Sequence, residues 1–585
     1  MIVLGITETH CATAAVLRDG EIVGCASEER FSRIKNDAGY PRQAVDALLR
    51  ELGLRPADVD LVALAGREAY ARDWMNRVLH DADYARGYYG VTLEPRGAGL
   101  GRRARKLGAR LGLAHSARGK TTLTSAERIA FVTDHLGIAR DRIVTLDHHT
   151  CHAASAYFGS PFQGADALVL TNDNSGDGLC ATAWRASGTT LERREATPSA
   201  PGSLGSLYSF VTLLLGMTFG EHEYKVMGLA PYADAQATER AAAALREVFD
   251  LTEGDPCLFA WKQRGPRYRQ LLEATLGLRF DAVAGGTQAL LEEALVRWTR
   301  LMRARHGGER LALGGGVFMN VKANMLLAAE EWVREMFVAP SSGDESNAIG
   351  AAYLGYLQLC AARGATPTPR PLGPLDLGPS LDAAEIEATL QRRDVATRHG
   401  VTEHERIEEK IADLLASGAV VARCTDRMEF GARALGNRSI LAHPGHPQVV
   451  PLINQMIKHR DFWMPFAPSI LRERADDYLL NPKGLHSPYM MVAFPTKPTR
   501  RNELVAAMHP SDATVRPQMV DAASNASYHR VIRAFERRTG IGAVLNTSYN
   551  LHGEPIVCSA DDAVDTFERS GLPHLALGRW LISKK

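Results

Sequence analysis

Paired cysteines, an excess of one charge and long apolar runs are all missing from this sequence of 585 residues. Its 8 cysteines contain no CxxC pair, so a zinc knuckle is not indicated and reduced thiols are favoured over a disulfide framework. The 68 Lys and Arg residues balance 67 Asp and Glu residues, which leaves no general basic field for wrapping DNA or RNA. The most apolar stretch, residues 208–219, is shorter than the roughly 18 to 20 residues that cross a membrane. We therefore expect neither a nucleic-acid partner nor a membrane partner.

The length and composition are those of a globular protein with two or more domains. Hydrophobic residues make up 45% of the chain and charged residues 23%, as in ordinary folded proteins. The N-terminal sequence MIVLGITETH has neither the basic nor the apolar segment of a signal peptide and is typical of a first β-strand. A cytoplasmic protein is expected.

Two segments share the order strand, loop, strand, turn, strand. The first comprises residues 2–6, 13–17 and 22–26, and the second comprises residues 167–171, residues 180–184 and the sequence after a Ser187-Gly188 turn. Asp19-Gly20 marks a hairpin turn in the first unit, and residues 172–178 are expected to form a polar loop in the second. Helical sequence follows each unit. The pattern predicts an α/β protein with a duplicated core of the actin-like ATPase (RNase H-like) kind, which holds a nucleotide between its halves.

Two histidines, His148 and His152, stand four residues apart at the start of an alanine-rich run that favours a helix. At 3.6 residues per turn the two imidazoles share one face, which is how a helix offers two ligands to a metal. The zinc-peptidase version of this pattern has a glutamate after the first histidine, whereas His149 stands there, so a peptidase is not expected. From these residues alone, a pair of surface or capping histidines is an equal alternative.

Two junctions before predicted helices carry glycine or acidic residues. Residues 311–313 are strand-like, three glycines follow, and a helix is expected over 320–328. Glycines at such a place let backbone amides approach a phosphate at a helix N-terminus, although tight packing of the turn selects glycine too. At the second junction Asp344 precedes an alanine-rich helix, where a helix cap explains it equally well.

A Pro/Gly-rich segment with little periodicity, residues 363–380, is expected to link two domains, residues 1–362 and 381–585. The second domain carries Arg, Lys, Ser and Asn in irregular, glycine-containing segments. Guanidinium groups match phosphate oxygens and Ser or Asn complete the shell, so this composition suits a small phosphorylated ligand. Taken singly, any one of these arginines is better explained as a surface residue.

Specific motifs occur in order along nearly the whole chain. They are His10 with Ala14-Ala15, Glu28-Glu29-Arg30-Phe31 with Arg33-Ile34-Lys35, HHTCHAASA, EYKVMGLAPY, GGGVFMN, GDESNAIGAA, MEFGARALGNRSIL and LNTSYNLHGEPIVCS. In this order and at this density the motifs resemble the O-carbamoyltransferases of the NodU/CmcH (tobramycin carbamoyltransferase-like) family.

The resemblance implies an N-terminal domain like the universal threonylcarbamoyl-tRNA synthase, itself actin-like, and a C-terminal YrdC-like α/β domain. It also implies two steps. The C-terminal domain makes carbamoyl adenylate from carbamoyl phosphate and ATP, and the N-terminal domain passes the carbamoyl group to an alcohol with release of AMP. The implied cofactors are Fe(2+), in a site that other divalent metals also fit, and Mg(2+) with the ATP. The implied acceptor is a hydroxyl of a small natural product, a sugar or a polyketide, in bacterial secondary metabolism such as antibiotic biosynthesis.

Carried over residue by residue, the resemblance implies a set of site residues. His10 matches the position that takes the proton from the acceptor alcohol, and Lys35 is expected beside the carbamoyl or phosphate group. Asp173 is preferred to Asp177 as a ligand because it ends the strand LVLTND. The implied metal ligands are His148, His152, Asp173 and Asp344. The residues implied around the nucleotide are Glu223, Lys225, Gly314, Gly315, Gly316 and Asn320, and those implied around carbamoyl phosphate and ATP in the C-terminal domain are Arg433, Lys458, Arg516 and Ser548.

The sequence departs from the family pattern at five places. Four of them are Cys11 for aspartate, Ala432 for proline, Ala513 for glycine and His443-Pro444-Gly445-His446 for Asp-Pro-Arg. At the fifth, Met464 stands where an arginine precedes PFAP, which removes a cation near the expected phosphate site. This last change puts the affinity for the carbamoyl donor in question.

Two other functions fit the same residues. One is a threonylcarbamoyl-type tRNA-modifying enzyme, against which the balanced charge argues, and the other is a non-catalytic nucleotide and metal sensor. No motif indicates the acceptor, because acceptor pockets are built from loop surfaces. Residues 103–120 are rich in Arg, Gly and Leu, and we assign them no function. The sequence leaves the oligomeric state open, with a homodimer as one option.

Overall fold

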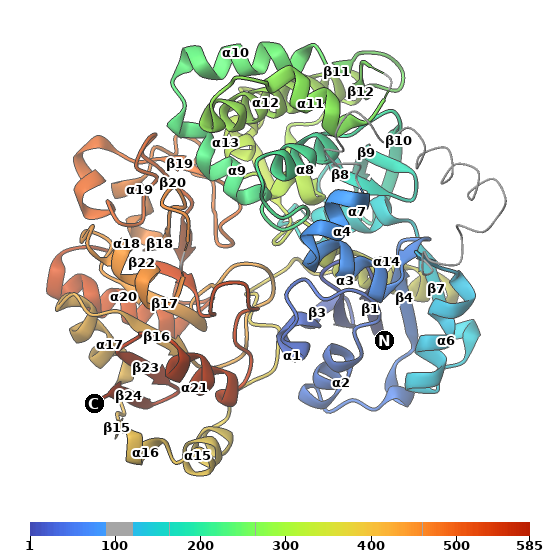
Figure 1. Ribbon diagram of the computed structural model, residues 1–585. Helices are drawn as coiled ribbons and strands as arrows, with labels where there is room; N and C mark the ends of the chain where they lie inside the picture. Colours follow the sequence, from blue (N-terminus) through green and yellow to red (C-terminus); the bar gives the residue numbers. More distant parts are fainter. Residues whose placement is uncertain (89–120, 163, 264, 459) are drawn as a thin grey trace, which may run out of the picture.

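The computed structural model describes residues 1–88, 121–162, 164–263, 265–458 and 460–585 (Figure 1). The basic residues 103–120 lie outside this part of the chain. No helix among the described residues is long and apolar enough to cross a membrane. Figure 1 shows a first lobe in blue and cyan, a second lobe in green, and the C-terminal part in orange and red beside both.

The first lobe contains a five-stranded sheet of order β3-β2-β1-β4-β7, in which the first two pairings are antiparallel and the last two parallel. The strands are β1 (Ile2–Thr7), β2 (Thr13–Arg18), β3 (Glu21–Ser27), β4 (Leu61–Ala65) and β7 (Ile143–Leu146). Asp19 and Gly20 both have positive φ in the turn from β2 to β3, as a tight hairpin requires. The predicted first unit is thus confirmed.

The second lobe repeats this topology, with a sheet of order β10-β9-β8-β13-β14 and the same succession of antiparallel and parallel pairings. The strands are β8 (Ala167–Gly176), β9 (Leu179–Ser187), β10 (Thr190–Pro198), β13 (Arg310–Gly314) and β14 (Glu335–Val338). The predicted duplicated α/β core is confirmed. The polar loop predicted at residues 172–178 is wrong, because β8 continues to Gly176 and turns at Asp177 and Gly178, both with positive φ.

Two alanine-rich helices, α7 (His148–Phe158) and α14 (Asn347–Arg363), pack against each other between the sheets. Helix α14 packs on β1 and β4, and α7 packs on β8 and β13. The approach requires glycine: a Cβ at Gly5 would lie 2.0 Å from the carbonyl oxygen of Ala348, and one at Gly350 would lie 1.8 Å from that of Cys151. The N-terminal ends of α7 and α14 meet, since Asn347 Nδ2 lies 3.2 Å from His152 Nε2.

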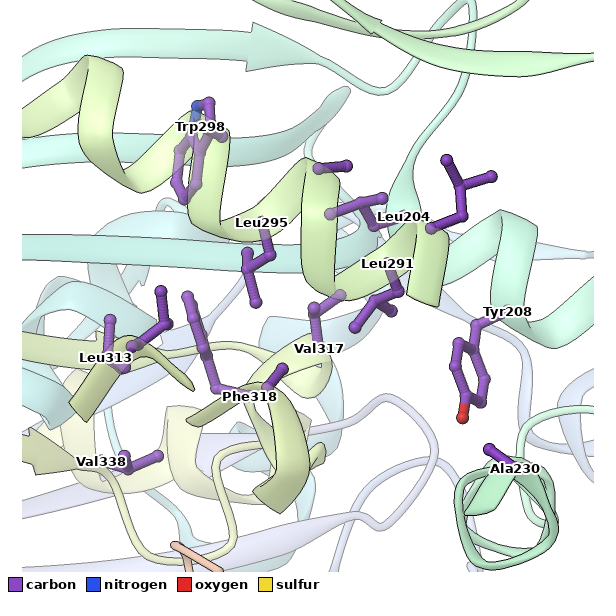
Figure 2. Packing of buried hydrophobic residues seen from close by; sticks show 14 of the residues in the cluster. Leu204, Tyr208, Ala230, Leu291, Leu295, Trp298, Leu313, Val317, Phe318 and Val338 are labelled. Atoms are coloured by element: carbon purple, nitrogen blue, oxygen red, sulfur yellow. The ribbon is translucent and has the colours of Figure 1, made fainter. Parts of the chain in front are cut away.

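Successive residues of β8 point to opposite faces of the second sheet, as the strand period of two requires. Val169 packs with the α7 side, whereas Leu168 and Leu170 join a core with α8 (Leu204–Leu214) and α12 (Phe280–His306). Figure 2 shows side chains of α12 meeting Phe318 in this core. Other elements of the N-terminal part are α1 (Glu29–Ser32), α2 (Arg42–Glu51), α3 (Arg72–His80), α4 (Ala82–Tyr88), β5 (Ala69–Tyr70), β6 (Thr122–Leu123), α6 (Ser125–Leu136), α9 (Glu223–Leu229), α10 (Ala235–Arg246), β11 (Phe249–Thr252), β12 (Leu258–Trp261), α11 (Arg267–Thr275), η4 (Gly316–Met319), α13 (Val321–Ala329) and η5 (Asp344–Ser346).

The C-terminal part is built on a mixed eight-stranded sheet of order β15-β24-β23-β16-β17-β22-β18-β21. Its strands are β15 (His399–Glu403), β16 (Val421–Cys424), β17 (Arg438–Ala442), β18 (Ala467–Leu471), β21 (Gln518–Val520), β22 (Ala543–Ser548), β23 (His574–Leu577) and β24 (Trp580–Lys584). Helices α17 (Ile407–Ala416) and α20 (Ala526–Thr539) pack together over residues of one face, and α21 (Ala560–Arg569) joins the core of the other. The YrdC-like assignment of this part stays a prediction.

Residues 365–382 form neither helix nor strand, as expected of the Pro/Gly-rich segment. They are nevertheless fixed between the two parts: the backbone N–H of Phe430 donates to the carbonyl of Leu375 at 2.7 Å, and that of Cys25 donates to the carbonyl of Leu377 at 2.9 Å. The main core also crosses the expected boundary, since Ile470 packs with the α12 cluster. The segment therefore docks the two parts onto each other, while the exact domain limits stay a prediction.

Candidate functional site

Four buried side chains converge where α7 and α14 meet. One ligand atom from each of His148, His152, Asp173 and Asp344 lies within 4.8 Å of the others. His152 Nε2 lies 3.0 Å from Asp173 Oδ2 and 3.5 Å from Asp344 Oδ1, and 3.1 Å from His148 Nε2. The structure thus brings together all four residues that the resemblance implies as metal ligands.

Each ligand has a local reason for its place. Asp147 caps α7 by accepting the backbone N–H of Thr150, so that the helix begins at His148. Asp173 lies on β8 of the second sheet, and Asp344 begins the 3-10 turn that leads into α14. Helix periodicity pairs the two histidines, and the packing of α7 against α14 and β8 brings the carboxylates to them.

The donor set fits a divalent first-row metal, because two imidazoles and two carboxylates give mixed N/O ligation. The Nε2 atoms of His148 and His152 face each other, and two N–H donors in this position could not form a hydrogen bond with each other. A single cation between them would instead accept a lone pair from each ring. Burial lowers the pKa of His152, but hydrogen bonds and charge from Asp173 and Asp344 outweigh it and raise the pKa to about 9. A metal would supply the positive charge that the two carboxylates favour at this position.

Two neighbouring polar residues are not part of the ligand set. His149 Nδ1 lies 2.7 Å from Thr171 Oγ1, and burial together with its histidine neighbours lowers the pKa of its imidazole to about 3. Asp177 accepts the backbone N–H of His148 at 2.8 Å and also binds the backbone amides of Arg67 and Glu68. Asp173, which the sequence favoured over Asp177, is therefore the aspartate that the geometry places among the four candidate ligands.

His10 faces this group from the loop between β1 and β2. Its Nδ1 lies 3.5 Å from Asp344 Oδ2, and 36% of its side chain is exposed, so a substrate can reach it. Burial lowers the pKa of His10, but the carboxylates of Asp344 and Glu345 outweigh burial and raise it. Lys35 pairs with Glu29, with its Nζ 3.0 Å from Oε2.

The residues expected around a nucleotide have structural partners. The carboxylate of Glu223 accepts from Ser209 at 2.7 Å, and Lys225 pairs with Asp461 of the C-terminal part at 3.1 Å. Asn320 caps α13 at Ala323. The glycines pack closely: a Cβ at Gly314 would lie 2.7 Å from the carbonyl oxygen of His152, one at Gly315 would lie 2.3 Å from that of Asn172, and one at Gly316 would lie 3.0 Å from Asp173 Oδ1. Tight packing beneath the metal ligands accounts for these glycines, and a role in nucleotide binding stays a prediction.

A second group of polar residues lies at one edge of the C-terminal sheet. Strands β17 and β18 both run antiparallel to β22, and β21 runs parallel to β18. The starts of β17, β18 and β21 therefore lie at the same edge as the end of β22. Arg433 precedes β17, Lys458 precedes β18, Arg516 precedes β21 and Ser548 ends β22.

Cations dominate this edge. Lys458 is 2% exposed, and its Nζ donates to Ser548 Oγ at 3.1 Å and to Asn550 Oδ1 at 2.6 Å. Burial lowers the pKa of Lys458 well below its usual range, and the charges of Arg460 and Lys35 lower it further. Burial likewise lowers the pKa of Arg516, with Arg433 and Arg460 adding to the effect. Within the described residues no carboxylate forms an ion pair with Arg433, Lys458, Arg460 or Arg516.

Arg460 is a member of this group that the sequence analysis missed. It stands two residues after Lys458, and the alternation Lys-x-Arg in a segment already chosen for its lysine was the available signal. Its guanidinium lies 5.4 Å from the ring centroid of Phe466. An adjoining pocket is lined by Tyr224 of α9 together with Arg433 and Arg516, and Met464 also lines it, where the family pattern has an arginine.

The two groups of residues adjoin each other across the boundary between the two parts. The backbone N–H of Ala432, beside Arg433, donates to Ser341 Oγ at 3.0 Å, and that hydroxyl donates to Glu345, next to the ligand Asp344, at 2.5 Å. Lys35 of the N-terminal part is also close enough to lower the pKa of Lys458. A ligand held by the cations would thus lie next to the metal ligands.

Comparison with known proteins bears on both groups. Models of the carbamoyltransferase N-terminus and the carbamoyltransferase C-terminus match residues 2–353 and 412–584. Nodulation protein NolNO of Sinorhizobium fredii is 32% identical over 99% of this chain and 80% of that protein. Nodulation protein NolO of Bradyrhizobium diazoefficiens is 34% identical over 75% of this chain and 79% of that protein. The uncharacterized protein sll1178 of Synechocystis is 31% identical over 100% of this chain and 96% of that protein.

Solved structures give weaker matches. Full-length HypF in its phosphate- and nucleotide-bound form is 10% identical with a TM-score of 0.33, over 62% of this chain and 56% of that chain. Component A of the (R)-2-hydroxyglutaryl-CoA dehydratase of Acidaminococcus fermentans is 14% identical with a TM-score of 0.32, over 61% of this chain and 98% of that chain. At such TM-scores these likenesses carry no argument about fold or function. The two family models cover the metal ligands and the cationic edge respectively, and this chain belongs to the carbamoyltransferase family.

Proposed function

We propose that this protein is an ATP-dependent O-carbamoyltransferase that makes carbamoyl adenylate in its C-terminal part and transfers the carbamoyl group to an alcohol at the metal site. The observation that carries the proposal is the adjacency of two unlike groups. One is the cations Arg433, Lys458 and Arg516, which form no ion pair with a carboxylate in the part of the chain that the structure describes, and the other is a buried N/O donor set with His10 beside it.

The cationic edge suits the first step. Carbamoyl phosphate and ATP bring several negative charges, and buried cations without counter-ions gain most from such ligands. Arg433, Arg460 and Arg516 would bind phosphate oxygens, while Ser548 and Lys458 hold one end of the site through their mutual hydrogen bond. Water attacks carbamoyl phosphate and releases phosphate and carbamate. A carbamate oxygen then attacks the α-phosphorus of ATP and pyrophosphate leaves, so that the carbamoyl group becomes linked to AMP.

The second step is attack of the acceptor hydroxyl on the carbamoyl carbon. His10 would take the hydroxyl proton at its ring nitrogen as the new C–O bond forms and AMP leaves; a positioned base of this kind contributes about 10²–10⁴-fold. A divalent metal held by His148, His152, Asp173 and Asp344 would act as a Lewis acid toward phosphate or carbonyl oxygens. Lys35, which pairs with Glu29 and lies near Lys458, would contact the carbamoyl or phosphate group.

Several finer assignments belong to the same proposal. The metal is Fe(2+), Mg(2+) accompanies ATP, and the two parts are an actin-like domain of residues 1–362 and a YrdC-like domain of residues 381–585, joined by residues 363–380. The acceptor is a hydroxyl of a small natural product, a sugar or a polyketide, and the reaction takes place in the cytoplasm. The net charge of +1 supports a small acceptor over tRNA.

The test is mass spectrometry after incubation of the metal-loaded protein with carbamoyl phosphate, ATP and a panel of hydroxylated metabolites. A product heavier by one carbamoyl group, with AMP, pyrophosphate and phosphate released, is expected. Absence of pyrophosphate and AMP under every donor condition would contradict the first step, and their formation without any carbamoylated product would contradict the second.

A further inference from the structure

The base and the metal ligands lie on different elements, and a four-residue segment between them is fixed from both sides. Residues 65–68 leave the end of β4 and pass between the His10 loop and the start of α7. Arg128 of α6 binds backbone carbonyls of this segment. Asp177 of the β8–β9 hairpin binds its backbone amides.

Arg128 connects this segment to the His10 loop. Its Nη2 donates to the carbonyl of Ala65 at 3.0 Å and its Nη1 to that of Gly66 at 2.6 Å, while its Nε forms an ion pair with Glu8, two residues before His10. Both side chains of the pair are fully buried. A buried ion pair contributes little net stability after desolvation, so its place is better explained by the geometry that it fixes.

Asp177 connects the same segment to the metal helix. Its carboxylate accepts the backbone N–H groups of Arg67 at 2.9 Å, Glu68 at 3.0 Å and His148 at 2.8 Å. The neighbouring Gly176 lies against the imidazole of His148, since a Cβ there would be 2.1 Å from its Cδ2. The hairpin tip therefore fixes both the backbone and the ring of the first ligand.

We propose that Glu8, Arg128 and Asp177 are positioning residues that hold the His10 loop and the first metal ligand in register through residues 65–68. None of the three belongs to the four-residue metal-ligand group. Each acts indirectly, by holding the backbone or the side chain of a residue that does the chemistry. This inference rests on the proposed function, because it concerns the same base and metal site.

Metal affinity tests the Asp177 half. Metal-stripped, full-length protein is titrated with Co²⁺ and followed by visible absorption. Asp177→Asn keeps a residue that tolerates positive φ, but it leaves one acceptor oxygen for three N–H groups. We therefore expect the Kd for Co²⁺ to rise about tenfold, as it does when other residues that orient metal ligands are changed. Asp147→Asn is the matched control: it caps the same helix without touching residues 65–68, asparagine caps as well as aspartate, and the Kd is expected to stay within about twofold.

Hydrogen exchange tests the Arg128 half. Arg128→Lys keeps the charge but cannot reach Glu8 and two carbonyls together, so amide exchange in residues 8–12 is expected to rise by about tenfold or more, while that of β8 stays unchanged. Arg142→Lys serves as the control, because the Arg142 guanidinium donates to the carbonyl of Val59 at 3.0 Å and has no other partner in the described part of the chain. Circular dichroism and thermal unfolding check that each variant is folded.

Equal Co²⁺ affinity in Asp177→Asn and Asp147→Asn, or unchanged exchange of residues 8–12 in Arg128→Lys, would overturn the proposal. Neither measurement uses a carbamoyl donor or an acceptor. Failure of the wild-type protein to transfer carbamoyl groups would therefore defeat the proposed function without affecting this test, and a negative result here would leave the transferase proposal standing.

Discussion

Cations at the edge of the C-terminal sheet that pair with no carboxylate among the described residues are expected to lower the stability of the ligand-free protein, and Arg433 is the place to measure that cost. Its Nε is buried without a hydrogen-bond partner among the described residues. Burial, aided by the nearby charge of Arg460, lowers the pKa of this guanidinium to about 10. We predict that Arg433→Met makes the ligand-free protein more stable and removes its response to phosphate.

The magnitude follows from that pKa. The difference from an ordinary guanidinium corresponds to roughly 3 kcal/mol by which burial penalises the charged form. At pH 7 the side chain is charged in the folded and the unfolded protein, since both pKa values lie well above neutrality, so the whole cost is present and is relieved only as the pH rises through about 10. Lost packing of the aliphatic stem offsets part of the gain, which leaves a net increase of about 1 to 3 kcal/mol.

The assay is equilibrium unfolding in denaturant, without phosphate and again with inorganic phosphate or carbamoyl phosphate. The wild-type protein is expected to gain about 2.7 kcal/mol at a ligand concentration of about 100 times Kd, and the variant to gain much less. Arg438→Met is the matched control. Arg438 is fully buried, but its guanidinium donates to the carbonyls of Thr425 and Cys558, so the same substitution leaves acceptors unpaired and lowers stability.

Two results would refute this reasoning. A loss of stability in Arg433→Met comparable to that of Arg438→Met would mean that Arg433 is a structural residue with partners of its own. An undiminished stabilisation of the variant by phosphate would mean that the ligand binds elsewhere.

The metal ligands, the base and the buried lysine each give a further prediction. His152→Ala is expected to lower bound Co²⁺ at least about tenfold in equilibrium dialysis, whereas His149→Ala retains the metal because that ring bonds to Thr171. His10→Ala is expected to lower carbamoyl transfer by about 10²–10⁴-fold while pyrophosphate release is unchanged; a sensor without catalysis would show no such split. Because the pKa of Lys458 is lowered by burial, phosphate binding is expected to take up protons and to weaken as the pH rises; identical calorimetric heats in two buffers of different ionisation enthalpy would contradict this.

The sheets could be predicted from the sequence where hairpins carry a local signal. Asp19-Gly20 between two apolar runs predicted the first hairpin, and both residues have the positive φ of a tight turn. The loop of the second hairpin was predicted to start too early, at residue 172, because Asn174 and Ser175 are exposed where β8 leaves the core, and polar residues in a strand resemble a loop. Asp177-Gly178 is the same turn signal as Asp19-Gly20 and could have located that hairpin.

The cationic edge could not be derived from sequence patterns, because it depends on register between strands that are far apart in the chain. Arg433 and Ser548 are separated by more than a hundred residues, and they approach because β17 and β22 pair with Ser439 opposite Ser548. No periodicity within either segment reports that pairing. Composition indicated that irregular segments of the second domain suit a phosphorylated ligand, but only the family resemblance singled out individual residues, and Arg460 was not among them.

The metal site could be predicted from the sequence in part. Helix geometry alone pairs His148 with His152, and a capping aspartate fixes where that helix begins. The carboxylates come from elsewhere: Asp173 from the second sheet, and Asp344 from the turn before the helix that packs on the first. A site whose ligands come from both copies of a duplicated fold exists only when the two copies pack as they do here, and glycines such as Gly350 permit that approach. The histidine pair can therefore be predicted from the sequence, whereas the complete four-ligand site depends on how the helices pack between the two sheets.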